Sequence, residues 1–512
     1  MRFKKSIIVV AALSLAATIV PLTMTAASSA ATKKAQTSST LTIGCLCTLT
    51  AGWDPYKTSY GNLYVPFFGA AYATLMDRTN SGAVVPGLVQ SWSYPTKLTF
   101  QMKLRPNLKF ADGEPLNAAA VKQNLERVVS GKVVGPTTNQ LSSVTKVTTT
   151  GSTTVTLTLS SVDPALPLDF TQMMGEMVAP EALNNPSDLN AAPDGAGPYV
   201  LDTANTTPGS LWTFTRNSNY YAPNAYPYSS VVFKYYATDT TALSALQTGQ
   251  IDVTRVSSEQ VAAAKGSGLS AVAWLSAING LWIDDRTGKV TPALKNVLVR
   301  QAINYAINKQ AVIKVNGGGT PESSMFWKGS QAYLASASNY YSYNPTKARK
   351  LLKEAGYAHG LKIAFLSDPF FDSINQVILA DLQAVGIKAS INDQTTNYET
   401  DLATSPVAYF FWFPQDAFND SKQLLLPNGG YNFLHTNDPQ VTKMFNAAAN
   451  ATSTAAANKD WQALNLYIVK QAWFAPIFND GSQYFVSNAQ TKVTYIDWND
   501  WPALQDLTPT AS

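Results

Sequence analysis

A strand–helix–strand pattern in the last third of the chain limits the folds that the chain can adopt. Residues 361–366 form a short apolar run, residues 373–385 repeat Ile, Leu and Val at helical spacing, and residues 387–391 form a second apolar run. Gly386 suits the left-handed position that follows a helix. Because two strands joined by a crossover helix pair in parallel with a right-handed connection, this half of the chain is predicted to be α/β.

The first half shows a different pattern. Apolar and polar residues partly alternate over 98–104, which predicts a strand with one buried face. Asn117 is expected to cap a helix over 118–129 with its side-chain oxygen. Thr and Val at a period of two over 144–159 predict a pair of strands that turn near Gly151. This part therefore contains a helix and a small sheet.

The N-terminus has the layout of a secretory signal peptide. Three basic residues within the first five precede an apolar run over 7–20, and small residues follow up to Ala30. The run is shorter than the ~20 residues of a membrane-spanning helix. We expect a signal peptide over 1–30 and a disordered Ser/Thr-rich tether over 31–40. The protein is thus expected to be exported, to the periplasm or the outer face of the cell membrane.

Composition argues against nucleic acid as a partner. Three of the 37 basic residues lie in the leader, which leaves 34 basic against 33 acidic residues. Charged residues make up 14% of the chain, below the ~25% of a typical domain. The two cysteines, Cys45 and Cys47, are separated by one residue, a spacing that fits disulfide geometry poorly. They are predicted to be buried strand thiols.

No motif of a known enzyme class is found. The chain has two histidines, His359 and His435, and lacks the H-E-x-x-H, G-x-S-x-G and phosphate-loop patterns. We therefore predict no catalytic residues, no metal site and no cofactor. A secreted hydrolase with a pair of carboxylates is the remote enzymatic alternative, because 33 acidic residues always allow some pair to be proposed.

Short groups of residues along the chain resemble those of a known family. They include Trp53–Pro55, Val85–Trp92, Leu104–Arg105, Lys109–Leu116, Gly195–Leu201, Leu243–Asp252, Val299–Asn308 and Lys350–Tyr357. In this order and spacing they resemble the family 5 extracellular solute-binding proteins of ABC importers, which include oligopeptide-, dipeptide- and nickel-binding proteins.

The resemblance implies a two-lobed α/β clamshell with a hinge of two crossing strands and an inserted third subdomain. Lobe I would comprise 41–88, 196–283 and 481–512, the inserted subdomain 89–195, and lobe II 284–480. The ligand would be enclosed between the lobes by hinge closure.

The resemblance also points to a ligand site near residue 416. Peptide-binding members have a G-W-x-x-D motif, whose aspartate pairs with the ligand's α-amino group. Here either Trp412 takes the Trp position and Gln415 replaces the acid, or Phe413 takes it and Asp416 keeps the acid. We favour Asp416 and keep Gln415 as the alternative, because only the acid forms an ion pair with an amine.

Further ligand candidates follow from the same resemblance. Family members line the cleft with residues at comparable positions, which in this chain are Tyr60, Tyr64, Trp282, Asp284, Tyr398 and Asn432. Asp284 stands where an asparagine is more usual. Each aromatic residue has a competing interpretation as a core residue, since the chain has 24 tyrosines, 21 phenylalanines and 11 tryptophans.

The leading prediction is a monomeric binding component of an ABC importer that delivers short peptides to membrane permease subunits. Oligosaccharide or another small solute is the alternative ligand. Nickel has little support, since the chain has few of the imidazole and sulfur ligands that suit it. A surface-bound sensory module would share the cleft but not the importer.

Overall fold

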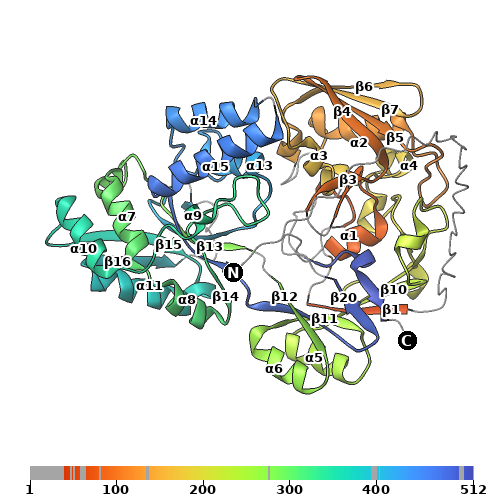
Figure 1. The fold of residues 1–512 in the computed structure, drawn as a ribbon. Helices are drawn as coiled ribbons and strands as arrows, with labels where there is room; N and C mark the ends of the chain where they lie inside the picture. Colours follow the sequence, from red (N-terminus) through yellow and green to blue (C-terminus); the bar gives the residue numbers. More distant parts are fainter. Residues whose placement is uncertain are drawn as a thin grey trace, which may run out of the picture. The chain divides into compact units, whose positions relative to one another are not determined.

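The structure is a computed structural model (Figure 1). It describes residues 40–46, 49, 52–57, 65–79, 82–133, 138–274, 277–393, 401–402, 404–451, 453–494 and 501–510. The predicted signal peptide lies outside these ranges, as does the predicted tether except for Thr40. Within them, no helix is both long and apolar enough to cross a membrane.

A seven-stranded sheet is assembled from distant parts of the chain. In spatial order its strands are β12 (Ser270–Trp274), β19 (Gln483–Ser487), β11 (Val253–Ser257), β1 (Thr40–Cys45), β10 (Ser230–Tyr235), β9 (Leu211–Arg216) and β8 (Tyr199–Leu201). The central strand β1 runs parallel to β10 and β11 and buries Leu41, Ile43 and Cys45 completely. A Cβ atom on Gly44 would lie 2.5 Å from Ile251 Cδ1, so a larger residue there would require the Ile251 side chain to shift. Cys47 lies outside the described residues.

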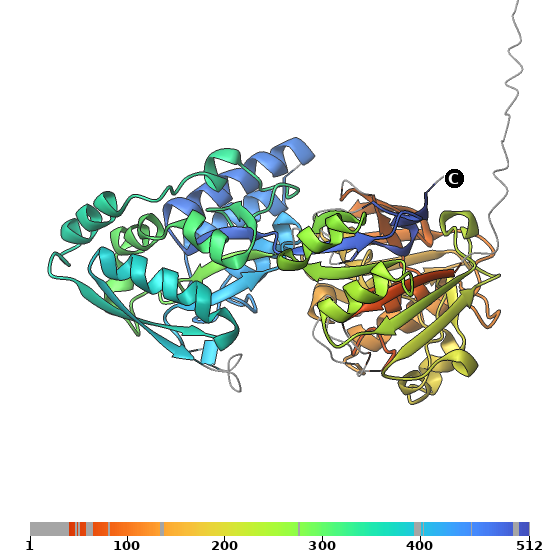
Figure 2. The same ribbon diagram turned by 90° about the horizontal axis from the view of Figure 1, so that it is seen from below.

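Helices cover this sheet and connect its strands. They are α1 (Val65–Ala71), α5 (Asp239–Gln247) and α6 (Ser258–Gly266). Helices α5 and α6 pack on β11 and β12 (Figures 1 and 2). A short hairpin near the chain end pairs β20 (Thr491–Val493) with β21 (Leu507–Pro509).

A four-stranded antiparallel sheet follows the first strands in sequence. Its spatial order is β4 (Val89–Thr96), β5 (Thr99–Leu104), β7 (Thr154–Leu159) and β6 (Val144–Thr150). The predicted strand and strand pair are confirmed, as is helix α2 (Ala118–Val129), whose cap Asn117 accepts from the N–H groups of Ala119 and Ala120. Next to the sheet lie β2 (Met76–Arg78), β3 (Val84–Pro86), α3 (Leu166–Asp169) and α4 (Pro180–Asn184).

A six-stranded sheet forms the core of the second half. Its strands are, in order, β14 (Gly319–Pro321), β18 (Phe474–Asp480), β13 (Ile278–Trp282), β17 (Ala408–Trp412), β15 (Leu361–Ser367) and β16 (Ile387–Asp393). The predicted strand–helix–strand unit is confirmed: β15 and β16 are parallel and α11 (Asp372–Ala384) joins them. Gly386 has a φ of +94°, the left-handed geometry that glycine adopts without strain.

The other helices of the second half complete this core. They are α7 (Val297–Ala306), α8 (Lys309–Asn316), α9 (Ala335–Ser338), α10 (Pro345–Glu354), α13 (Ala417–Leu425), α14 (Pro439–Ala449) and α15 (Thr454–Lys470). With the parallel β15–β16 pair and the helices around it, the predicted α/β fold class is confirmed.

The chain passes between the seven-stranded and the six-stranded sheet at two neighbouring places. At the first, β12 is followed after three residues by β13; at the second, β18 is followed after two residues by β19. In the seven-stranded sheet β12 pairs with β19, and in the six-stranded sheet β13 pairs with β18. Two adjacent strands therefore form the connection, as expected for a hinge.

Candidate functional site

A cavity of about 590 Å³ lies where elements of the two halves meet. Its wall includes the β2–β3 hairpin, the segment that leads into α3, residues 327–331, the start of α13 and the α14–α15 connection. Apolar residues alternate with polar side chains, of which the main ones are Arg78, Gln331, Gln415, Asp416 and Asn458. The volume and the mixed lining are those of a site for a small organic solute.

Asp416 is placed at the cavity by the abrupt start of α13. Strand β17 ends at Trp412, and Pro414 has no N–H to continue the ladder. Asp416 then caps α13: its Oδ1 accepts from the N–H groups of Phe418 and Asn419 at 2.7 and 3.0 Å. These are donors that no helix can satisfy internally.

The capping bonds leave Asp416 little capacity for a ligand. Its Oδ2 accepts from Asn419 Nδ2 at 3.0 Å. Since each carboxylate oxygen accepts about two hydrogen bonds, one acceptor position remains, on Oδ2. Burial raises the pKa of Asp416, and the two backbone N–H groups oppose that rise. Asp163 raises it further, and Arg78, from across the cavity wall, lowers it.

Trp412 and Gln415 are held together by a second acid, Asp420. The Oδ1 atom of Asp420 accepts from Trp412 Nε1 and from the backbone N–H of Gln415, both at 2.9 Å. The carbonyl of Gln415 accepts in turn from Trp327 Nε1 at 3.0 Å. Gln415 lines the cavity, whereas Trp412 is 5% exposed and packs edge-on against Tyr431.

Phe413, the other candidate for the Trp position, does not line the cavity. It is half-buried and packs edge-on against Phe411, with ring centroids 5.5 Å apart. Of the four candidates in this segment, the structure therefore brings Gln415 and Asp416 to the cavity. It places Trp412 and Phe413 beside it.

Trp282 and Asp284 are fully buried away from the cavity wall. Trp282, on β13, packs edge-on against Phe410 and Phe474. Asp284 follows β13 and lies 3.7 Å from Arg286 Nη1. Burial raises the pKa of Asp284 to about 7, against the lowering effect of Arg286.

Asn432 belongs to the same buried cluster. Its Oδ1 accepts from Arg286 Nη2 at 2.8 Å and from the N–H of Thr436 at 3.1 Å. Its Nδ2 donates to the carbonyls of Leu426 and Thr436, both at 2.9 Å. Both donors and both acceptor positions of the amide are thus used within the protein. Its role in this arrangement is to hold the segment after α13.

Three candidates, Tyr60, Tyr64 and Tyr398, lie outside the described residues. The cavity is also lined by four residues that no motif indicated, namely Arg78, Trp327, Gln331 and Asn458. Of these, only Trp327 could have been found from the sequence, because it is a large aromatic residue in the Gly- and Ser-containing stretch 327–331.

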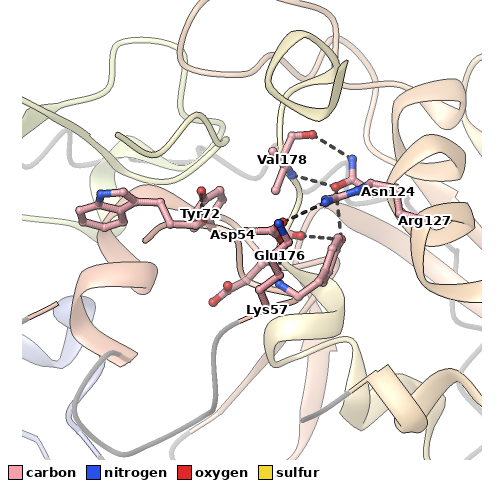
Figure 3. Close-up of polar contacts among 9 residues, drawn as sticks. Asp54, Lys57, Tyr72, Asn124, Arg127, Glu176 and Val178 are labelled. Carbon is pink, nitrogen blue, oxygen red and sulfur yellow. Dashed lines mark hydrogen bonds and ion pairs between the residues drawn. The ribbon is translucent and has the colours of Figure 1, made fainter. Parts of the chain in front are cut away.

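A separate network of buried polar side chains lies between the loop after β1 and helix α2 (Figure 3). Arg127 Nη2 of α2 forms an ion pair with Asp54 Oδ2 at 2.8 Å. Asn124, one turn earlier, donates to the carbonyl of Val178 and accepts from its N–H. Glu176 is 5% exposed, and burial raises its pKa to about 8.

The family model of the bacterial extracellular solute-binding proteins, family 5 (middle region), matches residues 83–433. The chain belongs to this family. The matched region contains the four-stranded sheet, the first crossing between the sheets, and the segment with Gln415 and Asp416. Both candidate acid positions thus fall in the part of the chain that defines family membership.

Relatives of the family agree with this assignment. The glutathione-binding protein GsiB of Escherichia coli O1:K1 / APEC is 32% identical over 304 residues. That alignment covers 57% of this chain and 58% of GsiB, so the chain matches less than two thirds of the curated relatives' length.

Two solved structures share the family 5 fold over almost their whole length. The ABC transporter substrate-binding protein CtaP of Listeria monocytogenes has a TM-score of 0.79 at 20% identity, covering 92% of this chain and 99% of CtaP. NikA of Brucella suis, solved with Fe(III)-EDTA, has a TM-score of 0.80 at 20% identity, covering 92% and 100%. The two-lobed α/β architecture is shared.

Proposed function

We propose that the chain is the solute-binding component of an ABC importer and that it captures short peptides in the cavity beside α13. The observation that carries this proposal is the cavity itself: about 590 Å³, lined by segments from both halves, with a basic and an acidic side chain in its lining, Arg78 and Asp416. A short peptide is a zwitterion with an apolar body, which this lining complements.

The importer role and the export of the protein rest on family membership. The family is one of extracellular solute-binding proteins, and CtaP is named as a substrate-binding protein of an ABC transporter. The division into lobe I, an inserted subdomain and lobe II, with the boundaries expected above, is part of the same proposal. The protein would release its ligand unchanged to permease subunits and act as a monomer.

An oligosaccharide is the second candidate ligand. The indole of Trp327 and the side-chain amides of Gln331, Gln415 and Asn458 line the same cavity. An aromatic face beside amides is suited to the apolar face and the hydroxyl groups of a sugar. Moreover, the capping bonds of Asp416 leave it one acceptor position, which a sugar hydroxyl can use as well as an amine.

Native mass spectrometry of the protein as purified tests the proposal. A ladder of short peptides bound to the protein supports it, whereas hexose-spaced adducts favour the second candidate. Incubation of the recovered ligand with the protein must return it unaltered, and turnover would overturn the binding role.

A pair of neighbouring substitutions on α15 tests the location of the site. Thr454 lines the cavity, whereas Ala455 does not, and both are exposed. Thr454→Trp is expected to remove the carried-over ligand by filling the cavity, and Ala455→Trp is the matched control that should retain it. Equal ligand content in the two variants would contradict the assignment of the cavity.

A further inference from the structure

Helices α3 and α13 are joined by one side-chain amide. The Nδ2 atom of Asn419, on α13, donates to Asp169 Oδ1 at 2.8 Å and to Asp416 Oδ2 at 3.0 Å. An amide NH₂ group has two hydrogens, so both are used and the amide bridges two carboxyl groups. Asp169 is 1% exposed and Asn419 5%, so water does not compete for either bond.

This bridge lies in the contact between the four-stranded-sheet region and the six-stranded-sheet region. Nearby, Lys422 Nζ of α13 donates to Ser142 Oγ at 3.3 Å. Leu168, one residue before Asp169, and Phe418, one residue before Asn419, both line the cavity. If the cavity is the ligand site, on which this inference rests, these two regions must separate for a ligand to enter.

The groups around Asp169 are mostly acidic. Asp163, from the segment before α3, and Asp416, from the start of α13, both raise its pKa, while Lys422 lowers it. Arg78 lowers the pKa of Asp416, Asp416 raises the pKa of Asp420, and Tyr94 of β4 donates its hydroxyl hydrogen to the carbonyl of Asp163. Asp163 itself accepts from Ser143 Oγ at 2.6 Å and from the N–H of Ala165.

The second oxygen of Asp169 has no partner. Among the described residues, no hydrogen-bond donor reaches Oδ2, which is buried. An ionised carboxylate would be costly there, because an unpaired buried charge loses its hydration. Burial and then the charges of Asp163 and Asp416 hold the pKa of Asp169 well above its ordinary value, more strongly than Asn419 and Lys422 lower it.

We propose that the Asp169–Asn419–Asp416 bridge is a latch that holds the two regions together around the ligand, and that closing the latch binds one proton. When α3 and α13 separate, Asp169 becomes hydrated and ionises with a pKa near its ordinary ~3.9. When they join, the carboxyl is protonated and Asn419 donates to its carbonyl oxygen.

The sign of the pH dependence follows from this difference. Below about pH 4 both states carry the proton, and closing has no proton cost. As the pH rises above that value, the open state ionises while the closed state keeps its proton, so closure weakens by up to tenfold per pH unit until the raised pKa of the closed state is reached. Ligand capture is therefore strongest in acidic surroundings.

Small-angle X-ray scattering of the ligand-free protein between about pH 5 and pH 8 tests the latch without a ligand. The radius of gyration of the wild type should grow as the pH rises. Asp169→Asn, which retains a carbonyl oxygen for Asn419 and cannot ionise, should stay compact across this range. A wild-type radius that does not change, or a variant that follows the wild type, would overturn the proposal.

Two further variants keep the test specific. Glu176→Gln makes the same acid-to-amide change at a buried acid that lies with Asp54 and Arg127 (Figure 3). It is not part of the α3–α13 bridge and should keep the wild-type pH response. Asn419→Ala removes the bridge and should be expanded at every pH. A compact Asn419→Ala protein would contradict the latch.

Calorimetric titration with glutathione as a tripeptide probe separates this inference from the proposed function. If the wild-type affinity falls by up to tenfold per pH unit as the pH rises, and the affinity of Asp169→Asn is constant, the result supports both the latch and peptide capture. A pH-dependent radius without any heat of glutathione binding supports the latch and counts against peptide capture. Binding with equal pH dependence in the two proteins refutes the latch alone.

Discussion

Two clusters of buried and half-buried acids in this molecule are stabilised in different ways. In the first, between the loop after β1 and α2, Asp54 faces a guanidinium, with Arg127 Nη2 at 2.8 Å. In the second, at the start of α13, Asp416 and Asp420 are held by backbone N–H groups, an amide and an indole. The first arrangement pairs opposite charges, whereas in the second burial raises the pKa of both acids.

The largest loss of stability is expected when the ion pair between Asp54 and Arg127 is broken. Arg127→Met leaves Asp54, whose side chain is 6% exposed, without the guanidinium. Removing one partner of a buried ion pair costs about 3–5 kcal/mol. Urea denaturation at neutral pH should show this loss, and the double variant Asp54→Asn/Arg127→Met should recover part of it. A loss below about 1 kcal/mol would show that this ion pair contributes no more to stability than an exposed one.

The next effect, at the buried acid Glu176 beside the first cluster, depends on pH. Its pKa is about 8 in the folded protein because of burial, and ~4.3 in an unfolded chain. The folded state therefore keeps the proton while the unfolded chain ionises, so stability is full below about pH 4 and is lost as the pH rises towards 8.

The variant Glu176→Gln removes this loss. Its stability advantage over the wild type should grow by up to about 1.4 kcal/mol per pH unit between about pH 5 and pH 8. Denaturation curves of both proteins at several pH values measure the difference. A constant difference would show that Glu176 is hydrated or paired, and the contrast between the two clusters would then be weaker.

The smallest effect is expected at Asp416, where capping and charge can be separated. Asp416→Ala removes the cap of α13 and should cost about 1 kcal/mol, whereas Asp416→Asn keeps a capping oxygen and should cost a few tenths. Ligand affinity measured on both variants shows whether the charge is used. A large loss of affinity in Asp416→Asn, which keeps the cap and loses only the charge, would support pairing of Asp416 with a ligand amine.

Much of the fold follows from local signals in the sequence. The α11 unit, the Asn117 cap and the β6–β7 pair are set by periodicity and by single capping or turn residues, which act over a few positions. Arg300 shows the limit. Its place in α7 does not reveal that its guanidinium donates to the carbonyls of Leu294, Lys295 and Gln471. Gln471 lies 171 residues away in the chain.

The candidate site was less predictable for the same reason. Asp416 and Gln415 were found because a motif names them, but Arg78 and Trp327 meet them only through the tertiary fold. The capping role of Asp416 was accessible from the sequence, since aspartate is a preferred N-cap residue and Pro414 ends the preceding strand. Trp412 and Asn432 show that a motif position can be occupied by a residue whose polar groups are satisfied inside the protein.

The order of strands in the seven-stranded sheet bears on how the chain matures. Strand β12 joins that sheet through β19, which is contributed by residues 483–487 near the end of the chain. During synthesis from the N-terminus, β12 therefore has no strand to pair with until residues 483–487 have been made. Such late, long-range pairing is slow. Loss of residues 483–512 would leave β12 without its partner strand, as an exposed edge that can pair with other chains.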